Sequence, residues 1–108
     1  MNSFFSVEEL PKKKEAWNKE AKRAEAYTEE TWEQIVKRIL YLCRKEKISL
    51  NALALRSGIT PSTLKSILYG KSKNPGIVTL KMLCDGFDIS IIDFFDTEHF
   101  RNLEQEIK

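Results

Sequence analysis

The strongest constraint on the fold lies in residues 48–80, where two short apolar-striped segments flank a single glycine. The first segment begins after Ser49, whose side chain suits a helix N-cap. Gly58 ends it, because glycine adopts the left-handed conformation that closes many helices. Ile59 follows and is expected to seal the turn from below. Since Ala54 has a small side chain, the next helix can approach closely, and the chain is expected to reverse sharply here.

A second helix is predicted directly after this turn. Thr60 is its expected N-cap, and Pro61 occupies the first helical position, where the missing N–H costs little. Gly70 ends the helix, and a polar loop follows it. The buried face is expected to consist of Leu64, Ile67 and Leu68. Two short helices that cross steeply leave the start of the second one exposed, with free N–H groups that suit phosphates.

Helical spacing of apolar residues continues on both sides of this pair, and no period-two alternation survives. The sequence therefore predicts an all-α fold without a sheet. Further helices are expected at about residues 12–27, from about Thr31, at about 77–87, after a cap at Ser90 and after a cap at Thr97. Their inward-facing residues are expected to be Ile35, Val36, Ile39, Leu42, Cys43, Leu80, Leu83, Cys84, Phe87, Ile91 and Phe94.

We expect three parts: a helical arm at residues 1–30, a domain of five short helices at 31–96 and a helical tail at 97–108. The arm is rich in Lys, Glu and Ala, which are strong helix formers, but it has too little apolar surface to fold alone. Its Trp17 docks on the domain, docks on a second chain or stays mobile. The tail is predicted to present one apolar helix face, formed by Phe100, Leu103 and Ile107.

Positive charge is concentrated in the middle of the chain. Residues 31–75 hold nine basic and two acidic residues, a net charge of +7, although the whole chain carries only +2. Residues 1–30 sum to −1 and residues 76–108 to −4. This distribution predicts a face that binds a polyanion; the alternative is an ordinary solvated surface.

No set of residues indicates catalysis or metal binding. Cys43 and Cys84 lie in apolar runs and, with the single His99, cannot complete a zinc site, so we expect two small buried side chains in a reducing compartment. No nucleophile–base pair or Gly-rich phosphate loop is present, and His99 is expected at the surface. We therefore expect no enzyme, cofactor or metal. Because acidic residues follow Phe4 and Phe5 early, we expect no signal peptide, and the apolar run 89–95 is too short to span a bilayer.

The segment LALRSGIT at residues 53–60, followed by TLKSILYG at 63–70, resembles the helix-turn-helix of the lambda-repressor/Cro-like (XRE) transcriptional regulators. The resemblance covers about residues 35–95 and implies a lambda-repressor-like domain whose second motif helix enters the DNA major groove. It places base contacts on Pro61, Ser62, Lys65 and Ser66. It places phosphate contacts on Tyr69, Lys71 and Lys73, and the start of the same helix adds Thr60.

Two positions depart from the pattern of the family. Many members have a Gln near the start of the first motif helix, where this chain has Leu50, and often another at the first base-facing position, where it has Pro61. Neither residue has a side-chain donor. We therefore expect specificity to depend on Lys65, which can donate to guanine O6 or N7, and on DNA shape.

The resemblance implies a cytoplasmic, nucleoid-associated transcriptional repressor that binds a palindromic operator in double-stranded DNA as a homodimer. No membrane or small-molecule ligand is expected. The dimer interface is predicted at the end of the chain, on Phe95, Phe100, Leu103 and Ile107. Two alternatives stay open: a helix-turn-helix domain reused for protein contacts, and an antitoxin-like or adaptor protein whose arm binds a protein partner, with Trp17 as its anchor.

Overall fold

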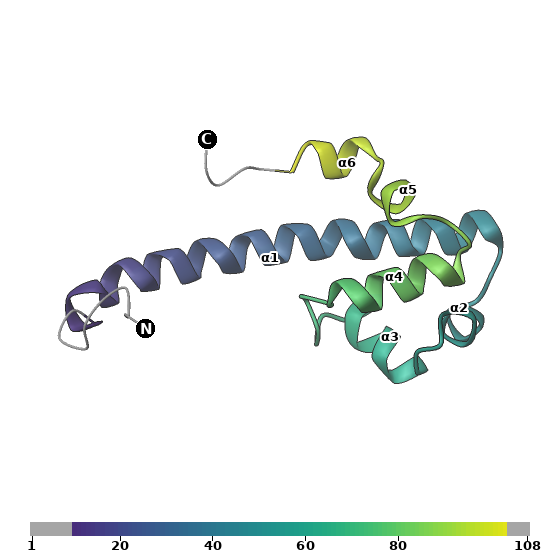
Figure 1. Ribbon diagram of the computed structural model, residues 1–108, viewed down its shortest axis with the longest axis horizontal. Helices are drawn as coiled ribbons and strands as arrows, with labels where there is room; N and C mark the ends of the chain where they lie inside the picture. Colours follow the sequence, from purple (N-terminus) through teal and green to yellow (C-terminus); the bar gives the residue numbers. More distant parts are fainter. Residues whose placement is uncertain (1–9, 104–108) are drawn as a thin grey trace, which may run out of the picture.

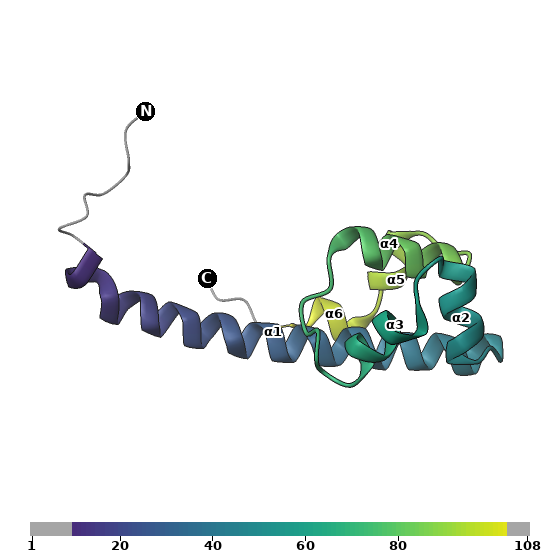
Figure 2. The ribbon, with the colours of Figure 1, turned by 90° about the horizontal axis from the view of Figure 1, so that it is seen from below.

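In the computed structural model, residues 10–103 are described, with side chains from residue 25 onward. The only regular elements in this part of the chain are helices, which confirms the predicted all-α class. The helices are α1 (Leu10–Glu46), α2 (Leu50–Ser57), α3 (Pro61–Leu68), α4 (Ile77–Gly86), α5 (Ile91–Phe95) and α6 (Glu98–Arg101). The C-terminal half of α1 lies against the shorter helices, whereas its N-terminal half extends beyond them (Figures 1 and 2).

Helix α1 is continuous over 37 residues, about 55 Å at 1.5 Å per residue. The prediction of two helices, one at about 12–27 and one from Thr31, is therefore wrong. Residues 28–31 contain neither Gly nor Pro, and good helix formers lie on both sides, so the helix stabilised by packing at its C-terminal end propagates through them. The division of the chain at residue 30 stays a prediction, and the side chain of Trp17 lies outside the described ones.

The same three-residue turn joins helices at three places: residues 47–49, 58–60 and 88–90. The first residue of each is left-handed, with φ of 56°, 73° and 58°. The second is an isoleucine that packs on the core and donates its N–H to the carbonyl five residues earlier, at 3.0–3.1 Å. The third is a Ser or Thr whose hydroxyl accepts an N–H three residues on. Each turn thus closes one helix and caps the next.

These turns confirm the predicted caps at Ser49, Thr60 and Ser90 and the left-handed Gly58. The positive φ of Lys47 and Asp88 could not be recognised from residue type, because neither is a glycine. The isoleucine that follows each of them is held by the core, and this contact offsets the cost of about 1 kcal/mol or more for a left-handed residue with a side chain.

The core forms where the C-terminal half of α1 meets α2, α3, α4 and α5. Ile39, Leu53, Leu83 and Phe94 are completely buried in it. Nine of the eleven core residues predicted outside the motif are buried, and the other two, Val36 and Ile91, are partly buried against them. The predicted inward faces of the two motif helices are buried as well, by Leu53, Ala54, Leu64, Ile67 and Leu68.

The last helix is shorter than predicted. α6 ends at Arg101, and Leu103 follows it in a bend, so the prediction that Phe100 and Leu103 share one helix face is wrong. Ile107 lies outside the described residues. The Thr97 cap is confirmed, since its hydroxyl accepts the N–H of Phe100. Phe100 packs on the core of the same chain, and α6 ends one residue later.

Helices α2 and α4 touch at Gly86, which generates a test of the packing. A Cβ built there would overlap Ser57 Oγ and lie 3.2 Å from the backbone nitrogen of Ser57. Because both helices have side chains buried in the core, neither helix can shift freely to make room for the added methyl group. Gly86→Ala should lower the free energy of unfolding by about 2 kcal/mol, measured by urea denaturation.

Two variants control this prediction. A Cβ at Gly76 would meet no atom within 4 Å, so Gly76→Ala should cost less than about 1 kcal/mol, the value of a lost glycine cap. Ser57 Oγ is buried without a hydrogen-bond partner, so Ser57→Ala should be neutral or stabilising by up to about 1 kcal/mol. Equal losses for Gly86→Ala and Gly76→Ala would contradict the close approach of the helices.

Candidate nucleic-acid interface

The outer face of α3 presents the residues that the sequence analysis assigned to DNA bases. Pro61, Ser62 and Lys65 are exposed, and Ser66 is partly exposed. The opposite face of the same eight-residue helix is buried in the core, so these side chains point away from the domain. The structure therefore brings the four predicted base-contact residues onto one exposed surface, and their roles stay a prediction.

The start of α3 is closed by its own side chains. Thr60 Oγ1 accepts the N–H of Thr63 at 3.1 Å and lies 2.9 Å from the hydroxyl of Thr63. Pro61 has no N–H, so Ser62 contributes the first backbone donor without an intrahelical partner. A phosphate at this position would meet the hydroxyls of Thr60 and Thr63 together with that donor.

The residues predicted to contact phosphates differ in availability. Lys71 is exposed and, like the base-facing Lys65, has no ionic partner among the described residues. Tyr69 is 75% exposed just past the end of α3. Lys73 is already engaged, because its Nζ lies 2.7 Å from Glu29 Oε2 and 5.2 Å from the centre of the Trp32 ring. Of the predicted phosphate contacts, Tyr69 and Lys71 are thus available. The hydroxyl of Thr60 already accepts the N–H of Thr63 and is only partly available.

A polar hollow of about 210 Å³ lies between α3, the loop after it and the start of α4. The N-terminus of α4 is capped by Gly76, which offers no side-chain oxygen, so its first N–H groups are unsatisfied. Hydroxyl and amide groups surround this end, and such a lining suits a phosphate oxygen. The hollow is lined by Thr63, Ser66, Ile67, Ser72, Asn74, Pro75, Gly76 and Thr79.

Sequence reasoning missed most of this lining, including Thr63, Ser72 and Thr79. The signal that could have found it is the run of small polar residues between two helices, with a glycine in place of a capping side chain. That signal is weak, because the same residue types are typical of an ordinary connecting loop. What brings the loop against α3 is the Ser72 N–H, which donates to the Ser66 carbonyl at 2.9 Å.

Helix α1 also contributes to this surface through a residue that the sequence analysis did not single out. Trp32 Nε1 donates to the Ile67 carbonyl, in the last turn of α3, at 2.6 Å. The two residues are 35 positions apart, and no local pattern predicts their contact. The bond places the indole beside the exit of α3, next to Gly70.

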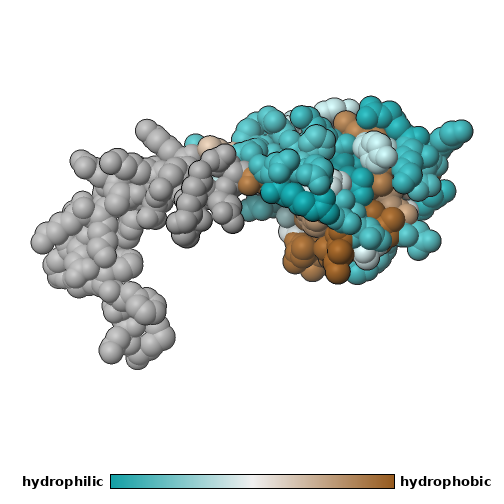
Figure 3. All heavy atoms as spheres, turned by 90° about the horizontal axis from the view of Figure 1, so that it is seen from above, coloured by the Kyte–Doolittle hydropathy of each residue, from teal (hydrophilic) through white to brown (hydrophobic). Residues whose placement is uncertain are grey.

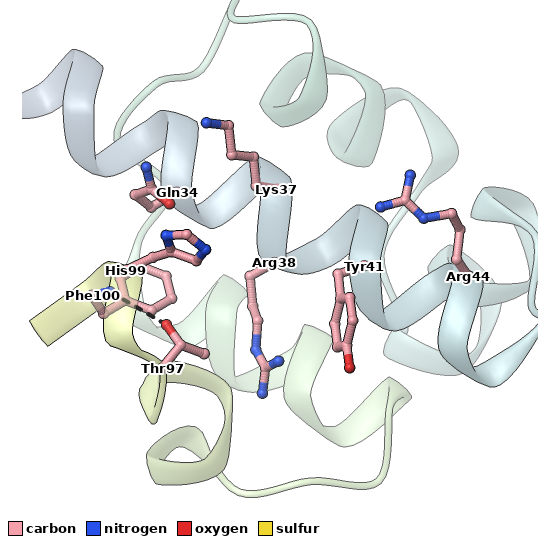
Figure 4. A pocket seen from close by; sticks show the side chains of 8 residues that line it. All are labelled: Gln34, Lys37, Arg38, Tyr41, Arg44, Thr97, His99 and Phe100. Atoms are coloured by element: carbon pink, nitrogen blue, oxygen red, sulfur yellow. Dashed lines mark hydrogen bonds between the residues drawn. The ribbon is translucent and has the colours of Figure 1, made fainter. Parts of the chain in front are cut away.

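The basic block does not form one face, contrary to the prediction from charge. Arg38 turns away from α3 and donates from Nε to the Phe94 carbonyl and from Nη2 to the Asp93 carbonyl, both at 2.8 Å. Lys37, Arg38 and Arg44 line a separate groove of about 480 Å³ between α1 and α6 (Figure 4). Its other lining residues are Gln34, Tyr41, Thr97, His99 and Phe100.

This groove lies on the other side of α1 from the contact with α3. Tyr41 lines it, and nine residues at about 100° each place Tyr41 opposite Trp32 on the helix. His99 is exposed at its edge, in agreement with its predicted surface position. The positive charge is therefore divided between the α3 surface and the α1–α6 groove.

The predicted dimer residues Phe95 and Phe100 are partly buried against the core of their own chain. Their rings meet edge to face with centres 4.8 Å apart. Ile92, beside them on α5, is 78% exposed. Figure 3 shows a mostly hydrophilic face with a cluster of hydrophobic side chains at its lower edge and several smaller hydrophobic spots. Whether this end of the molecule dimerises stays a prediction.

Both cysteines are buried, as expected. Burial raises the pKa of the Cys43 thiol, and burial also raises the pKa of Cys84, a shift that the charge of Lys81 opposes. Both therefore remain neutral thiols near pH 7. Among residues 10–103, no three His, Cys, Asp or Glu side chains cluster as metal ligands would. No helix in that range combines the length and the apolar character needed to cross a membrane.

Comparison with known proteins adds the family. The Cro/C1-type HTH DNA-binding domain matches residues 38–99. The HTH-type transcriptional regulator SlrR of Bacillus subtilis (strain 168) is 35% identical over 65 residues, which cover 59% of this chain and 43% of SlrR. The chain thus spans less than half the length of this relative. No solved structure matched. Because the family match covers more than half of the residues, the chain belongs to the Cro/C1-type HTH DNA-binding domain family.

Proposed function

We propose that this chain is a sequence-specific transcriptional regulator that inserts α3 into the major groove of double-stranded DNA. The observation that carries the proposal is the outer face of α3, where Lys65 is exposed, among polar or small neighbours and without an ionic partner in the described part of the chain. Lys65 is the one long donor among the predicted base contacts, and lysine pairs with guanine O6 and N7. The exposed Lys71 and Tyr69 and the polar hollow beside α4 would fix the register on the phosphates.

The regulator would act as a repressor and as a homodimer on a palindromic operator. A single α3 offers few base contacts, so a second copy would supply affinity and would place two half-sites about 34–36 Å apart. Occupation of a promoter then blocks transcription. The named relative is a transcriptional regulator, which supports a role in transcription regulation. We further propose a cytoplasmic protein that associates with the nucleoid and has no enzymatic activity.

A second candidate function rests on the N-terminal half of α1, which extends beyond the domain (Figure 2). A free-standing helix of this length is marginal alone, and in an antitoxin-like or adaptor protein it would bind a protein partner. Co-purification of a stoichiometric partner that is lost when residues 1–24 are deleted would favour this role. Unchanged pull-downs after the deletion would refute it.

The experiment that tests the main proposal is selection of duplexes from a random pool at two salt concentrations. We expect enrichment of one palindromic sequence and affinity that falls with salt. Binding that weakens with salt while enriching no sequence would reduce the chain to a non-specific DNA-binding protein.

Lys65→Ala should lower affinity for the selected duplex by about 1–3 kcal/mol and relax selectivity at one base pair, because it removes the longest base-facing donor. Lys71→Ala is the matched control: it removes an equal charge and should weaken selected and random duplexes alike, with a salt slope smaller by about one. Titrations by fluorescence anisotropy measure both. A Lys65→Ala protein with full discrimination would contradict the assignment of α3 as the reading helix.

Dimerisation is tested by sedimentation with and without the selected duplex. At micromolar concentration we expect a dimer, either free or assembled as two chains on one duplex, because burial of the exposed apolar side chains favours association. A single chain on each duplex at saturation would rule out the two-fold arrangement.

A further inference from the structure

The exit of α3 is held by a side chain from α1. An eight-residue helix is too short to be stable by itself. Trp32 Nε1 donates to the Ile67 carbonyl at 2.6 Å and adds to the longer bond that this carbonyl accepts from the Gly70 N–H at 3.4 Å. The indole is partly buried, so this bond is shielded from competing water. The end of the helix that carries Ser66 and leads to Tyr69 is thereby fixed to α1.

The backbone at Gly70 is shaped around the same indole. Gly70 has φ of 84°, a conformation that favours glycine. A Cβ there would lie 3.4 and 3.5 Å from two ring carbons of Trp32 and 3.2 Å from Cε of Lys73. The indole therefore lies in van der Waals contact with this turn, and the positive φ of Gly70 sets the path by which the chain leaves α3.

Glu29, one turn before Trp32 on α1, completes the contact. Its carboxylate lies 2.7 Å from Lys73 Nζ, which also sits over the Trp32 ring. Both charged side chains are more than a third exposed, so the pair adds little stability. Its effect is to direct Lys73 toward α1 instead of toward the surface that carries Lys65 and Lys71.

We propose that Glu29 and Trp32 form a positioning site that sharpens DNA discrimination: Trp32 fixes the exit of the reading helix, and Glu29 withholds Lys73 from phosphates. This inference rests on the proposed function. Both residues precede residue 38, where the match to the family domain begins. The part of α1 upstream of residue 38 therefore supplies residues that support the reading surface. These residues lie outside the matched domain.

Trp32→Phe tests the first half, since it keeps an aromatic ring beside Gly70 and removes the N–H donor. Loss of one shielded hydrogen bond should reduce affinity for the selected duplex about fivefold to tenfold and leave random duplex within about twofold. Amide hydrogen exchange at residues 67–72 should accelerate in the free protein. A mere loss of stability would not change the ratio of specific to random binding.

Arg38→Lys is the matched control for that variant. This variant also weakens hydrogen bonds from an α1 side chain to carbonyls near the end of another helix, here those of Asp93 and Phe94 in α5. The positive charge at position 38 is kept. We expect it to leave the ratio of specific to random binding unchanged. A ratio that falls equally in both variants would reduce Trp32 to a general stabilising residue and overturn the inference.

Glu29→Gln tests the second half with a change at an exposed site that does not threaten folding. Freed from its partner, Lys73 should reach a phosphate, so affinity for random duplex rises and the salt slope steepens by about one. Glu25→Gln is the charge-matched control, because Glu25 is exposed one turn earlier on α1. Equal slopes for the two variants would refute the role of Glu29.

The outcomes separate the positioning site from the function on which it rests. If the unaltered protein selects no sequence, the proposed function fails, and the positioning site fails with it. If the unaltered protein selects a sequence while Trp32→Phe and Glu29→Gln keep its full discrimination, only the positioning site is refuted.

Discussion

The apolar stripe on the C-terminal half of α1 is the contact on which the other helices depend. Ile35, Ile39 and Leu42 are buried at its centre, and full burial of such a side chain contributes about 1.5–3 kcal/mol. The helices packed against them have 4 to 10 residues, too few to be stable alone. Because α2 and α3 pack into the core that this stripe shares with α4 and α5, the exposure of the outer face of α3 is a consequence of core packing.

Local features of the fold could be predicted because their causes are local. Ser49, Thr60 and Ser90 cap helices through bonds to residues three positions on, and Gly58 closes one through its own φ. The continuity of α1 could not be predicted, because Thr31 suits both an N-cap and a helix interior, and packing decides between them. Lys47 and Asp88 adopt left-handed φ only because the following isoleucine is held by the core.

The candidate site was predictable in part for the same reason. Helical spacing sufficed to place Lys65 and Ser62 on the outer face of α3, since the inner face is marked by its apolar residues. The contact of Trp32 with Ile67 and the turn of Arg38 toward α5 join distant parts of the chain, and neither leaves a local signal. Counting charges along the sequence likewise merged two surfaces that α1 separates.

The central claim is that α3, and no other part of the surface, reads DNA. Chemical-shift mapping with the selected duplex tests it most directly, because it reports every amide at once. The account predicts the largest shifts at residues 60–66, with smaller ones in the loop to α4. Shifts concentrated at Lys37, Arg44 and His99, around the α1–α6 groove, with α3 unperturbed, would contradict it.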